Sequence, residues 1–138
     1  MRIVVDTSVL FSALLRMPNR YATTIFLGEH SFYSPKFVFI ELFKHKEKIT
    51  KCSKLTEDEI LELLHRLLKR IRISEEKQIS KDSLYQAYEL CKNIDLKDML
   101  FVALTIELDG YLWTSDDKLK KGLIKEGFTS FYEGESTL

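Results

Sequence analysis

Acidic residues follow two short apolar runs in this sequence of 138 residues. Asp6 comes directly after residues 3–5, and Asp116 comes three residues after the run 111–113. Aspartate is also a good helix N-cap, so either residue alone is consistent with a capping role. Ligands of open α/β sheets bind beyond the carboxyl ends of the strands. Two acids at that edge therefore favour a functional site as much as a pair of caps.

Two further carboxylates stand in apolar surroundings. Glu41 interrupts an apolar helical stretch, and a buried carboxylate is costly without a partner. It therefore faces a cation or a polar cleft, unless it lies on the surface and pairs with Lys44 or His45. Asp98 precedes a run of apolar residues that suits a helix buried against the sheet, and its carboxylate would project from the start of that helix.

Convergence of Asp6, Glu41, Asp98 and Asp116 would place four negative charges in one cleft. Such charges repel one another and raise each other's pKa values. A divalent cation relieves the repulsion, and oxygen ligands suit Mg²⁺ or Mn²⁺ better than Zn²⁺. A site of this kind polarises a phosphate and lowers the pKa of a bound water, as metal-assisted phosphodiester hydrolysis requires.

Two neighbouring acids compete for places in this set. Asp95 is the better helix cap because the helical pattern begins just after it, which leaves Asp98 free to point into the cleft. A tight turn after residue 113 would present only one of Asp116 and Asp117 inward. The helix dipole alone accepts either of these two.

The elements that must position these residues alternate between helices and short apolar strands. The strands lack the polar alternation of a one-sided sheet, so a parallel sheet covered on both faces is predicted, in the α/β class. The length suits a single domain over residues 1–138. Strands are expected at residues 2–5, 32–33, 71–73, 111–113 and 128–131, and helices at 7–16, 21–27, 36–51, 57–70, 96–108 and 118–125, with a further helix after Ser80.

Composition excludes several other classes of protein. Lys and Arg number 21, as do Asp and Glu, so a highly basic protein that coats nucleic acid is not expected. No apolar run approaches the length of a membrane span, and no signal peptide is recognised, so a cytoplasmic protein without a membrane partner is expected. Cys52 and Cys91 are expected to be reduced thiols.

At these same residues the sequence resembles the PIN domain family over nearly its whole length. The resemblance rests on Val-Val-Asp-Thr-Ser-Val-Leu at residues 4–10, Glu41, Lys-Asp-Met-Leu-Phe-Val-Ala-Leu at 97–104 and Trp-Thr-Ser-Asp-Asp-Lys at 113–118. It implies a three-layer α/β/α fold with a central parallel sheet of about five short strands.

The resemblance also implies a Mg²⁺- or Mn²⁺-dependent ribonuclease site. The catalytic and metal-binding acids would be Asp6, Glu41, Asp98 and Asp116. Thr114 would orient the last acid or the attacking water, and its spacing selects Asp116 over Asp117. Thr7 or Ser8 would do similar work beside Asp6.

Partners follow from the same resemblance. RNA is the expected substrate, and Lys118 is the best-placed basic residue to contact it because it lies nearest Asp116; most other basic residues suit solvated helix faces. The setting is either the toxin of a type II toxin–antitoxin pair, with an antitoxin protein as partner, or RNA processing. A homodimer is expected, since aromatic residues such as Phe11, Phe37 and Phe39 are numerous.

Two other functions remain as alternatives. A PIN-like module that binds RNA or protein without cutting would be expected to lose some of the four acids. A phosphoacceptor receiver domain would require an acidic pair after the first strand, where only Asp6 stands. The residues His30, His45 and His65 have no cooperating nucleophile or metal spacing, and we assign them no role.

Overall fold

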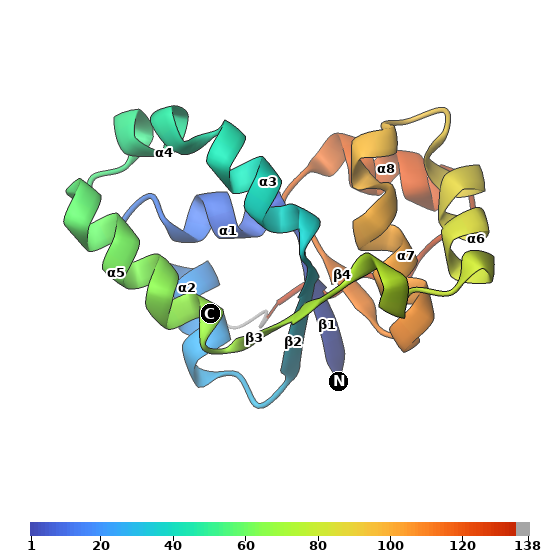
Figure 1. Cartoon of the computed structure of the whole chain (residues 1–138), viewed down its shortest axis with the longest axis horizontal. Helices are drawn as coiled ribbons and strands as arrows, with labels where there is room; N and C mark the ends of the chain where they lie inside the picture. Colours follow the sequence, from blue (N-terminus) through green and yellow to red (C-terminus); the bar gives the residue numbers. More distant parts are fainter. Residues whose placement is uncertain (135–138) are drawn as a thin grey trace.

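The computed structural model describes residues 1–134 and shows a parallel sheet between two groups of helices (Figure 1). In the described chain the sheet has the strand order β3-β2-β1-β4, and every neighbouring pair is parallel. The strands are β1 (Arg2–Val5), β2 (Ser31–Pro35), β3 (Ile71–Ser74) and β4 (Tyr111–Trp113).

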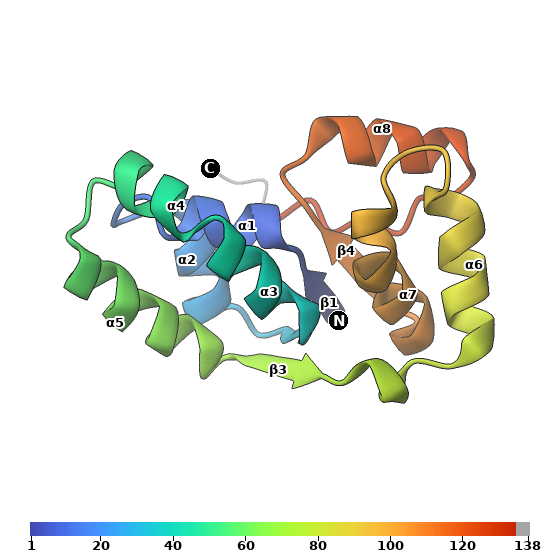
Figure 2. The ribbon, with the colours of Figure 1, turned by 45° about the horizontal axis from the view of Figure 1, so that its top comes forward.

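The helices form the outer two layers, as the α/β/α prediction requires. Figures 1 and 2 show α1 to α5 on one side of the sheet and α6 to α8 on the other. The helices are α1 (Thr7–Ala13), α2 (Arg20–Leu27), α3 (Phe37–Lys44), α4 (Lys46–Cys52), α5 (Glu57–Leu68), α6 (Lys81–Cys91), α7 (Met99–Leu108) and α8 (Asp117–Lys125), with 3₁₀ turns at Glu76–Gln78 and Leu96–Asp98.

The expected fifth strand at residues 128–131 is reduced to a single parallel bridge between Phe131 and Leu112. The backbone N–H of Phe131 donates to the carbonyl of Thr129 at 2.9 Å, and this local turn leaves one residue in register with β4. The segment still covers the outer edge of β4, because Leu112 donates to Ser130 and accepts from Tyr132.

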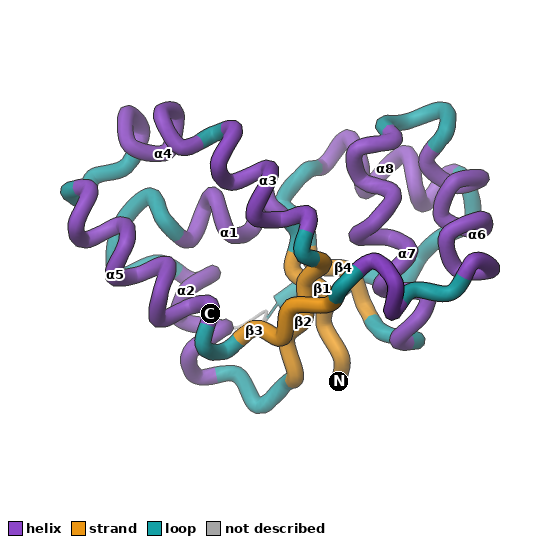
Figure 3. Tube along the Cα trace, viewed as in Figure 1, coloured by secondary structure: helices purple, strands orange, loops and turns teal. Residues whose placement is uncertain are grey.

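The helix expected over residues 36–51 is two helices, separated at His45 (Figure 3). Its backbone N–H closes α3 on the carbonyls of Glu41 and Leu42, and its own carbonyl accepts the first bond of α4 from Ile49. The change of direction lets Ile49 be buried while α3 continues to present Glu41 toward α1. No glycine or proline marks this break in the sequence.

Two elements form the centre of the core. Ile3, Val4 and Val5 of β1 are fully buried, as expected for a strand covered on both faces. In α7, all five residues from 101 to 105 are buried, and this helix packs on β1, β2 and β4. A helical segment that is apolar on all sides is expected to be buried on all sides, as residues 101–105 are; Glu107, nearer the end of α7, is exposed. No helix among residues 1–134 is long and apolar enough to cross a membrane.

Candidate active site at the carboxyl edge of the sheet

Asp6 and Asp116 lie beyond the carboxyl ends of adjacent parallel strands. Val5 of β1 pairs with Trp113 of β4, and the backbone N–H of Asp6 extends the ladder by donating to the Trp113 carbonyl at 3.2 Å. Each acid then begins a helix: Asp6 is the N-cap of α1 and Asp116 the N-cap of α8. The structure therefore shows both features expected from the sequence: the two helix caps, and a common edge of the sheet for Asp6 and Asp116.

The carboxylate of Asp6 is almost fully buried, with 4% of the residue exposed. Its Oδ1 accepts from the Ser8 hydroxyl at 2.6 Å and from the Val9 backbone N–H at 3.1 Å. Burial raises the pKa of Asp6 to about 6, and the charge of Asp116 adds to this rise; hydrogen bonds from Ser8, Thr114 and Val9 oppose it. Desolvation therefore disfavours the charged form of Asp6, and the three hydrogen bonds offset part of that cost.

Hydroxyl groups connect the two strand ends. The hydroxyls of Ser8 and Thr114 lie 3.2 Å apart, within hydrogen-bonding distance. Ser8 Oγ also accepts from the backbone N–H of Ser115, and Thr114 Oγ1 accepts from that of Asp116 at 3.0 Å. Thr114 thereby holds the backbone of the exposed Asp116, whose own carboxylate accepts from Leu119 N at 3.1 Å.

Glu41 reaches the same edge from α3. Its Oε1 accepts from the Thr7 hydroxyl at 2.7 Å, across 34 residues of sequence. Thr7, and not Lys44 or His45, is thus the hydrogen-bond partner that orients Glu41 in the described chain. The side chain is half-buried, because it lies between α3 and the first turn of α1.

Asp98 is the N-cap residue of α7, but its side chain caps no amide of that helix in the described structure. Burial raises its pKa to about 7, and the charges of Asp6, Asp95, Asp116 and Glu41 add to the rise. The neighbouring Asp95 instead caps the 3₁₀ turn before α7, accepting from Lys97 N at 3.0 Å, and pairs with the Lys97 ammonium at 3.8 Å.

One cavity of about 400 Å³ brings these acids together. Asp6, Glu41, Asp98 and Asp116 all line it, and so does Asp95. Thr114, Asp117 and Lys118 are not among its lining residues, and Lys118 is exposed on the first turn of α8.

The cavity is also lined by side chains that sequence reasoning did not place there, namely Phe11, Ser12, His45, Lys48 and Lys97. Lys48 belongs to the basic residues that the sequence assigned mostly to solvated helix faces, so its place in the cavity was not predicted.

Comparison with known proteins gives the same assignment as the motifs. A family model described as the PIN domain matches residues 4–130. The chain belongs to the PIN domain family. PIN domains are nucleases, which are generally dependent on a divalent metal ion, so the chain is a nuclease-family protein.

A solved structure with the same fold is the VapBC2 complex from Rickettsia felis, described as bound to a DNA fragment from the promoter. The match has a TM-score of 0.63 and 22% sequence identity, and covers 88% of this PIN domain and 92% of that chain. No curated protein sequence matches the chain.

The donor chemistry of this PIN domain fits a hard divalent cation, since every acid in the cavity offers carboxylate oxygens. Burial, with a smaller contribution from the charges of neighbouring acids, raises the pKa values of Asp6 and Asp98, and a bound cation would favour their charged forms. However, the described residues contain no group of three His, Cys, Asp or Glu side chains gathered closely enough to hold one ion. The four acids share a cavity without converging on one point.

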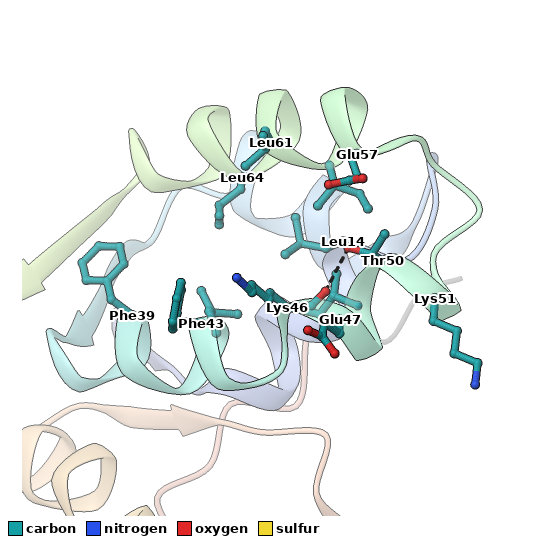
Figure 4. A pocket seen from close by; sticks show the side chains of 13 residues that line it. Leu14, Phe39, Phe43, Lys46, Glu47, Thr50, Lys51, Glu57, Leu61 and Leu64 are labelled. Carbon is teal, nitrogen blue, oxygen red and sulfur yellow. Dashed lines mark hydrogen bonds between the residues drawn. The ribbon is translucent and has the colours of Figure 1, made fainter.

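A larger cavity lies elsewhere, in a groove of about 820 Å³ between α3, α4 and α5 (Figure 4). Phe39 and Phe43 of α3 face Leu61 and Leu64 of α5 across this groove. The groove is mainly apolar and holds no cluster of acids with raised pKa values, so the smaller acidic cavity is the candidate active site.

Proposed function

We propose that this PIN domain is a Mg²⁺- or Mn²⁺-dependent endoribonuclease that hydrolyses RNA phosphodiester bonds. The observation that carries the proposal is the acidic cavity, in which carboxylates from four separate segments meet: Asp6, Glu41, Asp98 with its neighbour Asp95, and Asp116. Burial, and to a smaller extent repulsion by neighbouring acids, already raises the pKa values of two of these groups, Asp6 and Asp98. If Asp6, Asp98 and Asp116 served only as N-cap residues, nothing would require them to share one cavity with Glu41.

The four acids would hold the cation. When bound, Mg²⁺ or Mn²⁺ would neutralise the carboxylates and polarise the phosphate to be cut. The remaining residues position the acids: the Thr7 hydroxyl fixes Glu41, and the Ser8 hydroxyl fixes Asp6. Thr114 joins Ser8 to the backbone of Asp116, so that the ends of β1 and β4 keep a fixed spacing. Lys118, exposed beside Asp116, would contact an RNA phosphate.

The test is cleavage of a mixed RNA pool in a titration of Mn²⁺ and Mg²⁺. We expect cleavage by the wild-type chain and its loss in Asp98→Asn and Asp116→Asn. The matched controls are their neighbours, Asp95→Asn and Asp117→Asn, which remove the same charge from the same two segments. Loss of cleavage in the control variants, with Asp98→Asn and Asp116→Asn still active, would overturn the assignment of the acids.

A PIN-like module that binds RNA or protein without cutting it is the second candidate. The observation in its favour is that no three acids of residues 1–134 are gathered around one point. The presence of all four acids in the cavity argues against it. Binding of RNA with no cleavage at any Mn²⁺ concentration would select this candidate.

We also propose that the chain is the toxin of a toxin–antitoxin pair. Support comes from the solved VapBC2 neighbour and from the apolar groove, which leaves Phe43 68% and Leu61 63% exposed. An amphipathic helix of an antitoxin would cover such a groove with its apolar face. RNA processing is the alternative setting.

The antitoxin proposal is tested by co-expression with the product of the adjacent gene and measurement of complex formation. We expect Phe43→Lys and Leu61→Lys to weaken the complex at least about tenfold. Leu27→Lys is the matched control, because Leu27 is 78% exposed on α2 and does not line the groove. Equal binding by all three variants would exclude the groove as the docking surface.

A further inference from the structure

A second cavity, of about 460 Å³, opens where the loop after α1 meets the start of α2 and the end of α4. Its charged lining residues are Arg16, Arg20 and Lys54, and no carboxylate of the described chain lines it. The segments that supply these cations are separated by more than thirty residues of sequence, so the cavity is a product of the fold.

The three positive charges have no acidic partner among the described residues. Among residues 1–134, none of Arg16, Arg20 and Lys54 forms an ion pair with a carboxylate. The guanidinium of Arg20 lies over the ring of Tyr21, 5.0 Å from its centre, and donates to the Tyr21 hydroxyl at 3.3 Å. Like charges that share one hollow repel each other, and an anion bound among them relieves the repulsion.

The wall of this cavity is held by hydrogen bonds that do not involve the cations. The backbone N–H of Lys54 donates to the Leu15 carbonyl at 2.7 Å, and the Ser53 hydroxyl donates to the Leu14 carbonyl at 2.7 Å. The Asn19 amide closes the loop on the Ala13 carbonyl at 2.9 Å. The hollow is therefore formed before any ligand binds, and its cationic heads remain free to bind one.

The position of the cavity connects it to the candidate active site. Ser12 lines both cavities, whereas Asp6 caps the opposite end of the same helix. A helix of seven residues such as α1 is about 10 Å long. A strand of phosphates that leaves the acidic cavity along α1 would therefore reach the basic cavity within a few nucleotides.

We infer that Arg16, Arg20 and Lys54 form a phosphate-binding subsite that holds the backbone of single-stranded RNA a few nucleotides from the cleaved bond. This inference rests on the proposed ribonuclease function. A cleft of carboxylates repels a polyanion, and a separate cationic subsite supplies the attraction that the acidic cavity lacks. Tyr21 is a positioning residue in this arrangement, because its hydroxyl and ring orient the Arg20 guanidinium.

The first test measures binding of a fluorescein-labelled mixed-sequence RNA dodecamer in EDTA, where no metal-dependent cleavage occurs. The variant carries Arg16→Gln, Arg20→Gln and Lys54→Gln together. We expect its affinity to fall at least about tenfold at low salt, and the slope of log K against log salt to decrease by about 2. The matched control carries Lys77→Gln, Lys81→Gln and Lys125→Gln, three exposed lysines outside the basic cavity.

The outcomes separate the subsite from the catalytic proposal. Asp6→Asn should bind the dodecamer at least as tightly as the wild type, even where cleavage is lost. In Mn²⁺, the triple cavity variant should show a raised KM with little change in kcat on the dodecamer, and an unchanged rate on a dinucleotide too short to reach the subsite. Equal affinity and slope in wild type and triple cavity variant would overturn the inference, as would an equal loss in the control.

The second test uses the exposed Cys52 as a reporter, since it lies in the wall of the basic cavity while Cys91 is buried. Bound dodecamer should slow alkylation of Cys52 by iodoacetamide several-fold in the wild type and in Asp6→Asn, and not in the triple cavity variant. Inorganic phosphate at the same total phosphate concentration should protect much less. Equal protection by inorganic phosphate would show a free-anion site, and no protection by RNA would also overturn the inference.

Discussion

Asp6 is both a helix cap and a member of the acidic cavity, because its Oδ1 accepts from Val9 N while the residue lies at the carboxyl end of β1. Asparagine is nearly as good an N-cap as aspartate. Replacement of Asp6 by asparagine therefore separates the two roles, since it keeps the cap and removes the charge.

We predict that Asp6→Asn abolishes RNA cleavage in Mn²⁺ and leaves thermal stability at pH 8 equal to or above that of the wild type. The physical reason is that a buried carboxylate with a raised pKa opposes folding when it is charged. Cleavage and melting temperature are measured on the same preparation. Cleavage that continues unchanged would show that Asp6 is only a cap.

The raised pKa of Asp98 predicts that the free energy of unfolding depends on pH in the absence of metal. Its pKa is raised from 3.8 to about 7, so between these values the folded state binds more protons than the unfolded state. The free energy of unfolding should therefore fall as the pH rises through this window. Urea midpoints at pH 5 and pH 8 in EDTA measure the fall.

Asp98→Asn should make that pH dependence smaller, and Asp117→Asn should leave it as in the wild type. Asp117 is exposed at the start of α8 and does not line the acidic cavity, so it provides the matched control. A wild-type midpoint that is higher at pH 8 than at pH 5 would contradict the prediction.

At the scale of elements, Thr114 joins the end of β4 to the starts of α1 and α8. We predict that Thr114→Val lowers kcat for RNA cleavage at least about tenfold and lowers the free energy of unfolding by about 1 kcal/mol, because valine offers no hydroxyl to Ser8 or Asp116. Thr114→Ser keeps the hydroxyl and should restore most of kcat. If valine and serine variants have equal kcat, Thr114 does not position the acids.

Sequence patterns predicted the strands and helices that hold the acids better than they predicted the loops, helix breaks and cavity-lining residues around those acids. The apolar run before Asp6 and the apolar helix after Asp98 each have a physical signature, since fully buried parallel strands and central helices lack polar positions. The shared edge of β1 and β4 followed from parallel topology. The cap at Asp95 followed from short-range hydrogen-bonding rules.

Other features had no local signature. The break at His45 occurs without glycine or proline, and the fifth strand shrank to one bridge because of a turn at residues 129–131. The basic cavity joins the loop after α1 to the end of α4, a contact that no periodicity encodes. The entry of Lys48 and Lys97 into the acidic cavity likewise depends on tertiary placement.

At the scale of the whole molecule, equal numbers of acidic and basic residues conceal a separation of charge. The acidic and basic cavities adjoin through Ser12, so a bound polyanion would meet both along α1. The even net charge argues only against a highly basic protein that coats nucleic acid, and a local cluster of cations such as the basic cavity is compatible with it.

Homodimerisation remains a prediction. Phe11, Tyr21, Phe26 and Phe37 pack partly against the core, whereas Phe39 is exposed in the described structure. Exposed apolar side chains on one helix favour association. We expect light scattering at micromolar concentration to give twice the chain mass of 16.2 kDa. A mass equal to that of one chain would show a monomer.

The burial of residues 101–105 of α7 has a consequence for local motion. Amide protons exchange with solvent through local openings near surfaces and through global unfolding in the most protected elements. The amides of residues 101–105 lie in the centre of the core and belong to the second kind. The backbone that carries Asp98 into its helix should therefore keep its position for as long as the chain stays folded. Exchange in deuterated buffer should show that the amides of residues 101–105 exchange only through global unfolding.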